Sequence, residues 1–425
     1  MLRSNSCPYS FGNSLKLSSL AETRVMKITD VKATPVTVPM EAPLRWSMGI
    51  ETGTTRTIVE LSTDAGVVGI GETYGGNATA QAILNSCAPL VKGEDPSEIG
   101  KIIAKFSPYF EIPYETSVPP HAFAGVEMAC WDAVGKSQDK PVSSLLGGAL
   151  KQEIPFISYL FYRYEGKGGI PAIDSAETML KYHERLEKKY GKFSGAKIKG
   201  GVFRPEEEMK AVKLFRETQG DDFALRFDPN GFWSVETSIR ILKQMEQYNL
   251  EFVEDPTLYI EGMARVRKEV SIPFSTNMCV IWFNQIMPAV RLGAIDMIQE
   301  DLHYWGGLQL NRKLVSIAEA LQLGLAIHSD RELGISTAAV LHFVSSQPWL
   351  THAVDSHYHH QEDDIITEPF TYRDGKIKVP DGPGLGVEID RKKLDKYAKM
   401  YKEQGDVNEF YDSRRPNWIP VMPQF

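Results

Sequence analysis

Six polar residues stand at nearly even intervals through the middle of the chain, and each closes a short apolar run. By subtraction of residue numbers they are 29, 26, 23, 24 and 27 positions apart: Lys199, Asp228, Glu254, Asn277, Asp301 and His328. The segments between the runs have helical periodicity. A strand, a helix and their two loops take roughly 25–40 residues. The spacing therefore predicts a parallel (β/α) barrel that presents one polar group at the carboxyl end of each strand.

A simpler interpretation applies to each of these residues taken alone. An acidic residue after a strand is often only the N-cap of the next helix. The interval itself is that of the βα unit, so it supports the fold more strongly than any function. Six residues in register, of the types that one chemistry needs, are nevertheless hard to assign to chance.

Composition excludes two classes of partner. The 425 residues are 42% hydrophobic and 24% charged, which is ordinary for a globular protein, and the net charge is −8. No long basic run suggests nucleic acid as a partner, and the apolar runs are too short to cross a bilayer. The four cysteines are scattered and form no CxxC motif. This is typical of reduced thiols, and we expect a cytoplasmic protein.

The pattern divides the chain into four parts. The serine-rich residues 1–25 are predicted to be a disordered or targeting extension, with Met26 as an alternative start. Residues 26–150 are predicted to form an α+β domain, residues 151–388 the barrel, and residues 389–425 a segment that packs back on the first domain.

Local signals predict the elements of these parts. We expect a three-stranded sheet in the α+β domain, with strands at 26–38, 57–61 and 67–71. Proline and glycine predict a loop at 39–54. Helices are expected near 77–91, 97–106 and 121–138, and the last barrel strand at 352–355.

Three of the strand-end residues have the chemistry of a magnesium site. Asp228, Glu254 and Asn277 offer two carboxylates and one carboxamide oxygen. Hard oxygen ligands suit Mg²⁺, and the absence of His and Cys among the three argues against zinc. Capping or salt bridges explain the triplet equally well on spacing alone.

Two pairs of residues are candidates for acid/base work. Lys197 and Lys199 lie on one face of a strand, where mutual repulsion and burial are expected to lower their basicity, so that one can act as a general base. Such a KxK pattern is common, and a solvated face explains it as well. Asp301 can orient His328 and raise its basicity. A metal between two such groups can stabilise the enediolate formed by removing the proton next to a carboxylate, which leads to racemisation or dehydration.

These residues resemble the mandelate racemase-like branch of the enolase superfamily. The resemblance covers residues 26–415 and rests on Lys-Ile-Lys at 197–199, Asp-Pro-Asn at 228–230, Glu-Asp-Pro at 254–256, Asn277 and the Asp301/His328 pair. It implies a modified TIM barrel, (β/α)7β, with an N-terminal α+β capping domain completed by the C-terminal segment. It also implies Lys199 as base, Lys197 as its electrostatic partner and Mg²⁺ as cofactor.

Within the branch, the sequence is most similar to the glucarate dehydratases. Thr276-Asn277-Met278 and Pro383 to Asp390 resemble that group's third ligand and closing segment. The resemblance implies that Asn230, His357 and Tyr159 contact the substrate. Residues 39–54 lack the histidine that the group carries there. Arg45 and Arg331 are further candidates for a carboxylate of a diacid, although a surface position explains either equally well.

We therefore expect a Mg²⁺-dependent acid-sugar dehydratase that acts on glucarate or a similar hexarate and is a homo-oligomer. A racemase or epimerase on the same residues is the first alternative. A non-catalytic barrel is the second, but it would be expected to have lost some of the site residues. Trp46 and Met48 should lie in a lid over the barrel mouth, since the chemistry requires that water be excluded.

Overall fold

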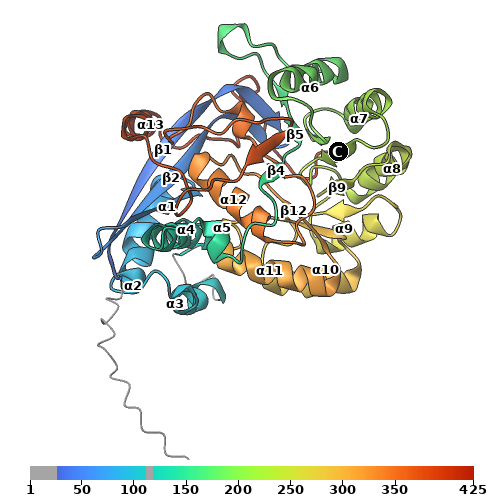
Figure 1. Cartoon of the computed structure of the whole chain (residues 1–425). Coiled ribbons are helices and arrows are strands. Elements are labelled where there is room, and N and C mark those ends of the chain that lie inside the picture. The colour runs from blue at the N-terminus through green and yellow to red at the C-terminus, as the bar shows by residue number, and fades with distance from the viewer. Residues whose placement is uncertain (1–25, 112–117) are drawn as a thin grey trace, which may run out of the picture.

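The computed structural model of the protein describes residues 26–111 and 118–425, which form a barrel with an α+β domain beside it (Figure 1). The predicted extension at 1–25 lies outside the described residues. No helix in the described ranges is both long enough and apolar enough to cross a membrane.

Parallel strands form the ring of the barrel. One sheet has the order β10-β9-β8-β7-β5, and β11 pairs in parallel with β12. The bounds are β5 (Ser158–Leu160), β7 (Gly195–Lys199), β8 (Ala224–Asp228), β9 (Phe252–Glu254), β10 (Phe274–Ser275), β11 (Met297–Glu300) and β12 (Gly324–Ile327).

Backbone hydrogen bonds outside these strands close the ring. Asp296 N donates to Phe274 O at 2.8 Å, which joins β11 to β10. Asp355 N donates to Ile327 O at 3.3 Å, and Ile157 N donates to Val354 O at 3.0 Å. The expected last strand at 352–355 is thus only a short extended stretch, with a single bridge between Val354 and Phe156. It still occupies the eighth position of the ring.

Seven helices follow the strands and lie outside the ring (Figure 1). They are α6 (Ala176–Tyr190), α7 (Pro205–Gln219), α8 (Val235–Met245), α9 (Ile260–Arg267), α10 (Phe283–Leu292), α11 (Leu308–Leu321) and α12 (Gly334–Ser346). In α8 the Ser234 side chain caps the first turn by accepting from Thr237 N, and Ile241, Leu242 and Met245 are buried. The parallel barrel predicted from the spacing is confirmed, and so is the (β/α)7β form that the resemblance implies.

The α+β domain contains a four-stranded antiparallel sheet in the order β3-β2-β1-β6. Its strands are β1 (Ile28–Trp46), β2 (Gly49–Thr63), β3 (Val68–Tyr74) and β6 (Tyr162–Arg163). The expectation of three strands was wrong, because β6, which follows the first barrel strand, pairs with the end of β1.

The loop predicted at 39–54 was also wrong. Leu44 pairs with Glu51 and Trp46 with Gly49, so β1 and β2 form one long hairpin that turns at Ser47 and Met48. Pro39 and Pro43 lack the N–H that a regular ladder needs. The chain accommodates them in an irregularity of the pairing between Pro39 and Leu44, and the strand then continues.

Helices follow this sheet along the chain, and some of them pack on it. They are α1 (Asn77–Ala82), a π-turn at Ile83–Cys87, α2 (Ala88–Val91), α3 (Ile99–Glu111), α4 (Pro120–Ser137) and the short α5 (Val142–Leu145). Helix α4 packs directly on β3, where a Cβ at Gly71 would lie 2.0 Å from Gly125 O. Only glycine permits this close approach.

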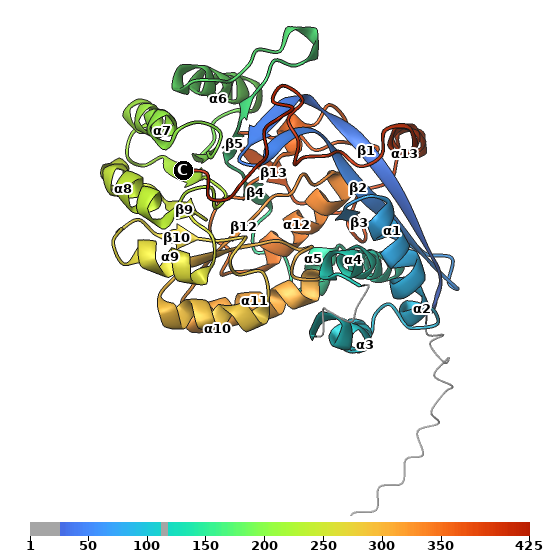
Figure 2. The ribbon, with the colours of Figure 1, turned by 180° about the vertical axis from the view of Figure 1, so that it is seen from behind.

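The C-terminal part returns to both domains. Strand β13 (Lys376–Lys378) pairs with β4 (Glu153–Pro155), and α13 (Arg391–Gln404) lies along β1. Tyr401 Oη accepts from Asn77 N at 2.6 Å, so this segment completes the capping domain as predicted. The chain then runs back to the barrel, where its end lies beside α8 and Phe425 O accepts from Ser234 N at 2.5 Å (Figure 2).

Candidate active site

The six evenly spaced residues meet at the carboxyl end of the barrel. Lys199 pairs directly with Asp228 in the β7–β8 register, and Glu254 ends β9 beside Ser275 of β10. Asn277 lies two residues after β10, while Asp301 and His328 directly follow β11 and β12. Parallel strands place their ends at one edge, which explains why residues far apart in sequence share one site.

Lys197 lies inside the barrel among carboxylates. Its Nζ is 2.6 Å from Glu254 Oε2, 2.8 Å from Asp355 Oδ2 and 3.6 Å from Asp228 Oδ2, and all four side chains are fully buried. Burial alone would lower the pKa of Lys197, but the carboxylates of Asp355 and Glu254 outweigh it and hold the pKa well above its usual value. The expectation of lowered basicity was therefore wrong for Lys197, which is a fixed ammonium ion.

Lys199 has a different environment. Its Nζ lies 2.5 Å from Asp228 Oδ2, and the side chain keeps 6% of its surface exposed to the cavity described below. Tyr159 and Phe161 place aromatic rings 5.9 Å from the same nitrogen. Of the two lysines, Lys199 is the one that can reach a bound molecule.

The three predicted metal ligands leave oxygen atoms without hydrogen-bond partners. Among the described residues no donor reaches Glu254 Oε1 or Asn277 Oδ1, although both atoms are buried. Buried polar atoms normally have partners, so two orphaned acceptors beside Asp228 fit a bound cation. Asp255 fixes the position of Asn277, because its Oδ2 accepts from Asn277 N at 2.8 Å. Carboxylate and carboxamide oxygens are the ligand set that suits Mg²⁺.

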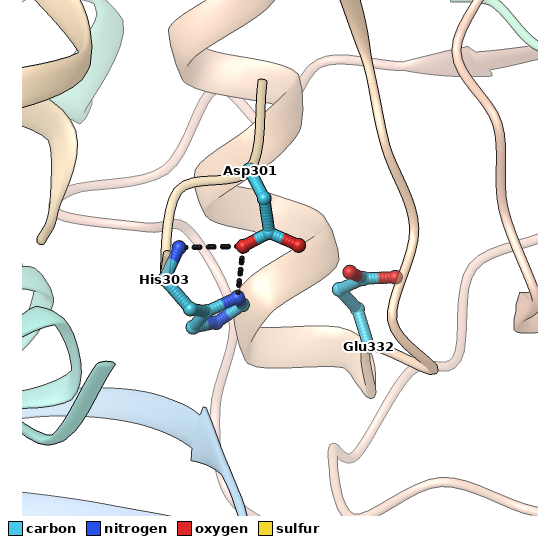
Figure 3. A group of neighbouring side chains, drawn as sticks. All are labelled: Asp301, His303 and Glu332. Carbon is cyan, nitrogen blue, oxygen red and sulfur yellow. Dashed lines mark hydrogen bonds and ion pairs between the residues drawn. The ribbon is translucent and has the colours of Figure 1, made fainter. Parts of the chain in front are cut away.

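Asp301 orients two histidines. Its Oδ2 lies 3.0 Å from His328 Nδ1. Its Oδ1 lies 3.0 Å from His303 Nδ1, a contact that Figure 3 shows. Burial lowers the pKa of His328, but the hydrogen bond and charge of Asp301 outweigh it, so the pKa is raised. With Nδ1 held by Asp301, Nε2 is the His328 nitrogen available for acid/base work.

A second group of possible metal ligands, Asp301, His303 and Glu332, has donor atoms within 4.8 Å of one another (Figure 3). Hydrogen-bond donors already occupy these atoms. Glu332 accepts from Ser329 Oγ at 2.6 Å and from Asp330 N at 2.8 Å. The Arg56 guanidinium lies 3.1 Å from His303 Nε2 and would repel a cation there. We interpret this group as a hydrogen-bond network behind His328.

A cavity of about 270 Å³ lies over these residues. Predicted site residues that line it are Lys199, Asn277, His328, Asn230, Tyr159, Arg331 and His357. Trp46 and Met48, at the tip of the β1–β2 hairpin, also line it, so the capping domain covers the barrel mouth as predicted.

Arg45 does not belong to this cavity lining. Its guanidinium lies between the rings of Tyr164 and Phe203, at 4.8 and 4.7 Å from their centroids. Side chains alternate along a strand, so Arg45 and Trp46 point to opposite faces of β1. Arg45 is therefore not placed to bind a substrate carboxylate, and the expectation that it does so was wrong.

Several residues of the site were not identified from the sequence. Asp355, which pairs with Lys197, could have been found as a polar residue at the end of the last expected strand. His303 lies in a turn two positions after Asp301, where the strand pattern has ended. Glu51, Glu409 and Phe410 reach the cavity from β2 and from the C-terminal segment, and no local signal indicates this.

Comparisons with known proteins agree with the arrangement of a capping domain and a barrel. Residues 28–147 match the N-terminal domain of mandelate racemase / muconate lactonizing enzyme, and residues 178–393 match the enolase C-terminal domain-like family. The chain belongs to the enolase superfamily. The matches fall on the capping domain and the barrel, and they identify the mandelate racemase and muconate lactonizing enzyme family within it.

Individual members of the family cover nearly the whole chain. A probable glucarate dehydratase of Streptomyces coelicolor is 34% identical, over 95% of this chain and all of its own. The crystal structure of an enolase from Mycobacterium smegmatis, complexed with tartrate, has a TM-score of 0.88 at 35% identity, covering 95% of this chain and 99% of its own. One from Gibberella zeae, complexed with magnesium, formate and sulfate, has a TM-score of 0.86 at 33% identity, covering 94% and 97%.

Proposed function

We propose that the protein is a Mg²⁺-dependent dehydratase of acid sugars. It removes the proton next to the substrate carboxylate and eliminates the β-hydroxyl group, which gives a 2-keto-3-deoxy acid. One observation carries this proposal: Lys199 and His328 line the same small cavity as Asn277, whose Oδ1 is a buried acceptor without a partner among the described residues. An S. coelicolor relative with the name of a dehydratase supports the reaction class.

The metal is proposed to bind Asp228, Glu254 and Asn277. When bound, Mg²⁺ would neutralise the substrate carboxylate and the negative charge that grows on it as the proton leaves. The magnesium in the Gibberella zeae relative supports this choice of ion.

The acid/base work is assigned to two side chains. Lys199 Nζ takes the proton from one face of the substrate and His328 Nε2 takes it from the other, according to the configuration of the carbon. The buried Lys197 ammonium contributes fixed positive charge, since Glu254 and Asp355 hold it protonated. His328, as imidazolium, gives a proton to the departing hydroxyl, and Asp301 keeps its ring in place.

The cover of the cavity protects this chemistry from water. Trp46 and Met48 from the hairpin and Phe410 from the C-terminal segment form its apolar part. Trp46 and Phe410 rings lie 5.5 Å apart, and Trp46 Nε1 donates to Glu409 O at 3.1 Å, so the hairpin and the C-terminal segment support each other. Exclusion of water strengthens the charges at the reacting end.

A screen of aldonic, pentaric and hexaric acids with Mg²⁺ tests the proposal, with formation of a 2-keto acid as the signal. Asn277→Leu should lose both turnover and Mg²⁺ binding measured by titration calorimetry. Asn284→Leu, at an exposed position of α10, is the matched control and should keep both. Hydrogen exchange without 2-keto acid would indicate a racemase or epimerase instead, and no reaction with any acid would contradict the proposal.

A further inference from the structure

One end of the cavity is formed by charged residues from three parts of the chain, none of which is a proposed metal ligand. Glu51 comes from β2, Asp330 and Arg331 follow β12, and Glu409 belongs to the C-terminal segment. His357 also lines this end. We call these five residues the distal end. The arrangement depends on the return of the chain after α13, since Glu409 forms an ion pair with Arg331 in the cavity lining.

Arg331, the cation of the distal end, is already engaged. Its Nη1 donates to Glu409, and its Nη2 lies 2.6 Å from Asp330 Oδ1. Glu51 Oε1 lies 3.8 Å from the same Nη1. A guanidinium binds a carboxylate best through two parallel N–H groups, and here the side chains of the protein already take those positions.

The balance of charge at the distal end is negative. One guanidinium faces the three carboxyl groups of Glu51, Asp330 and Glu409, so the sum is −2 when all are ionised. Burial raises the pKa of Glu51 to about 7, against the opposing effects of Arg331 and Lys199, so Glu51 carries only part of its negative charge near neutral pH. In a buried cavity such charges repel a further carboxylate strongly.

Two acceptor atoms at the distal end lack partners among the described residues, namely Glu51 Oε2 and His357 Nε2, and they lie 3.7 Å apart. Ser329 Oγ donates its proton to Glu332, so it accepts a hydrogen bond from His357 Nδ1–H at 2.9 Å. Burial holds the pKa of His357 well below its usual value, so the ring is neutral and Nε2 carries no proton. Glu51 and His357 expose only 6% and 4% of their surfaces, and both line the cavity, so a molecule bound there can donate to these two atoms.

From this geometry we infer that the non-reacting end of the substrate is an uncharged hydroxylated chain, whose hydroxyl groups donate to Glu51 and His357. The enzyme would then act on monocarboxylic (aldonic) sugar acids in preference to dicarboxylic (aldaric) ones. The inference rests on the proposed function and narrows its substrate class. This substrate class differs from the hexarate that the sequence resemblance implies. The second carboxylate of a diacid would need Arg45 or Arg331. Arg45 is stacked between two aromatic rings outside the cavity, and the charge of Arg331 is neutralised by carboxylates of the protein.

Matched pairs of acids test this inference directly. Gluconate and glucarate share the configuration of their internal carbons, as do galactonate and galactarate, and differ only in the charge of the far end. With Mg²⁺-loaded protein, kcat/KM for the preferred monoacid should exceed that for its diacid by about 10-fold or more. A diacid that reacts as well as its monoacid would overturn the inference.

Charge variants locate the cause of the preference. Glu409→Gln removes the carboxylate paired with Arg331 Nη1, which leaves that nitrogen available to a second substrate carboxylate. Glu51→Gln removes a negative charge that lines the cavity. Each variant should therefore reduce the monoacid-to-diacid ratio of kcat/KM by about 10-fold. Glu403→Gln is the control, because Glu403 is 62% exposed on α13 and pairs only loosely with Lys399, at 3.8 Å. A ratio that neither Glu51→Gln nor Glu409→Gln changes would overturn the inference.

Failure of the proposed function is distinguishable from failure of this inference. If none of the acids is dehydrated, the proposed reaction is wrong, and titration calorimetry of the same pairs then tests the charge preference alone. Tighter binding of the monoacids would support the distal end as described. Equal or tighter binding of the diacids would overturn it.

Discussion

Replacement of Lys197 by methionine tests the charge balance inside the barrel. Methionine has a similar length and volume but no charge. Without the ammonium, Asp355 keeps the Arg226 guanidinium at 2.7 Å and Asp228 keeps Lys199 at 2.5 Å. Glu254 keeps only the neutral Gln299 amide at 2.6 Å and has no other cationic partner among the described residues. The substitution therefore leaves one buried carboxylate uncompensated.

An uncompensated buried charge of this kind destabilises a protein by about 3–5 kcal/mol. Urea-induced unfolding of the chelator-treated Lys197→Met protein should show this loss as a lower midpoint. Added Mg²⁺ should restore more stability to the variant than to the wild type, because a cation at Asp228, Glu254 and Asn277 neutralises the same carboxylates. Activity should be lost in either condition, since the fixed positive charge is gone.

The matched control is Lys192→Met. Lys192 also pairs with a glutamate, at 2.5 Å from Glu187 Oε2, but its side chain is 82% exposed. Exposed pairs contribute less than about 1 kcal/mol. Equal losses for the two variants in chelator would refute the reasoning, and so would a Lys197→Met protein as stable as the wild type.

Two further predictions concern Asp301 and Glu127. Asp301→Asn should move the alkaline limb of the kcat/KM profile assigned to protonated His328 to lower pH, because the hydrogen bond that raises the pKa of His328 is weakened. Ser336→Ala should leave that limb in place, because the Ser336 hydroxyl bonds to His303, Arg56 and Glu72 O rather than to Asp301 or His328. Glu127 accepts from Trp131 Nε1 and from the backbone N of Leu308 and Gln309, and burial raises its pKa from 4.5 to about 7. As the pH rises, the unfolded chain releases the Glu127 proton at a lower pH than the folded protein does. The free energy of unfolding of the wild type, relative to that of Glu127→Gln, should therefore fall as the pH rises from 4.5 to 7 and then level off. Urea unfolding at several pH values would show this. A constant difference across that range would contradict the assignment.

The barrel and the centre of the site could be predicted because each strand contributes one polar group at its end. This regularity is local, so Lys199, Asp228, Glu254, Asn277 and His328 could be read from apolar runs and their spacing. The pairing of Lys197 with Asp355 could not, since the eighth strand is only a bridge at Val354. The expected repulsion between two lysines was therefore outweighed by carboxylates from other strands.

The cover of the cavity could not be predicted in the same way. Proline in the stretch 39–54 indicated a loop, but an irregularity in the β1–β2 pairing accommodates it, and the hairpin continues to Trp46. Glu409 lies 78 positions from Arg331 and reaches it only because α13 packs on β1. Contacts of this range depend on the tertiary fold, and they decide which charges face the substrate.

The central claim is that Lys199 and His328 remove protons from opposite faces of the carbon next to a carboxylate. Exchange of that hydrogen in deuterated water, followed by proton NMR on two acid sugars that differ only in configuration at this carbon, tests it most directly. We predict that Lys199→Ala abolishes exchange with one epimer and His328→Ala abolishes exchange with the other, while circular dichroism shows both variants folded. Loss of exchange with both epimers in one variant, and with neither in the other, would contradict the account.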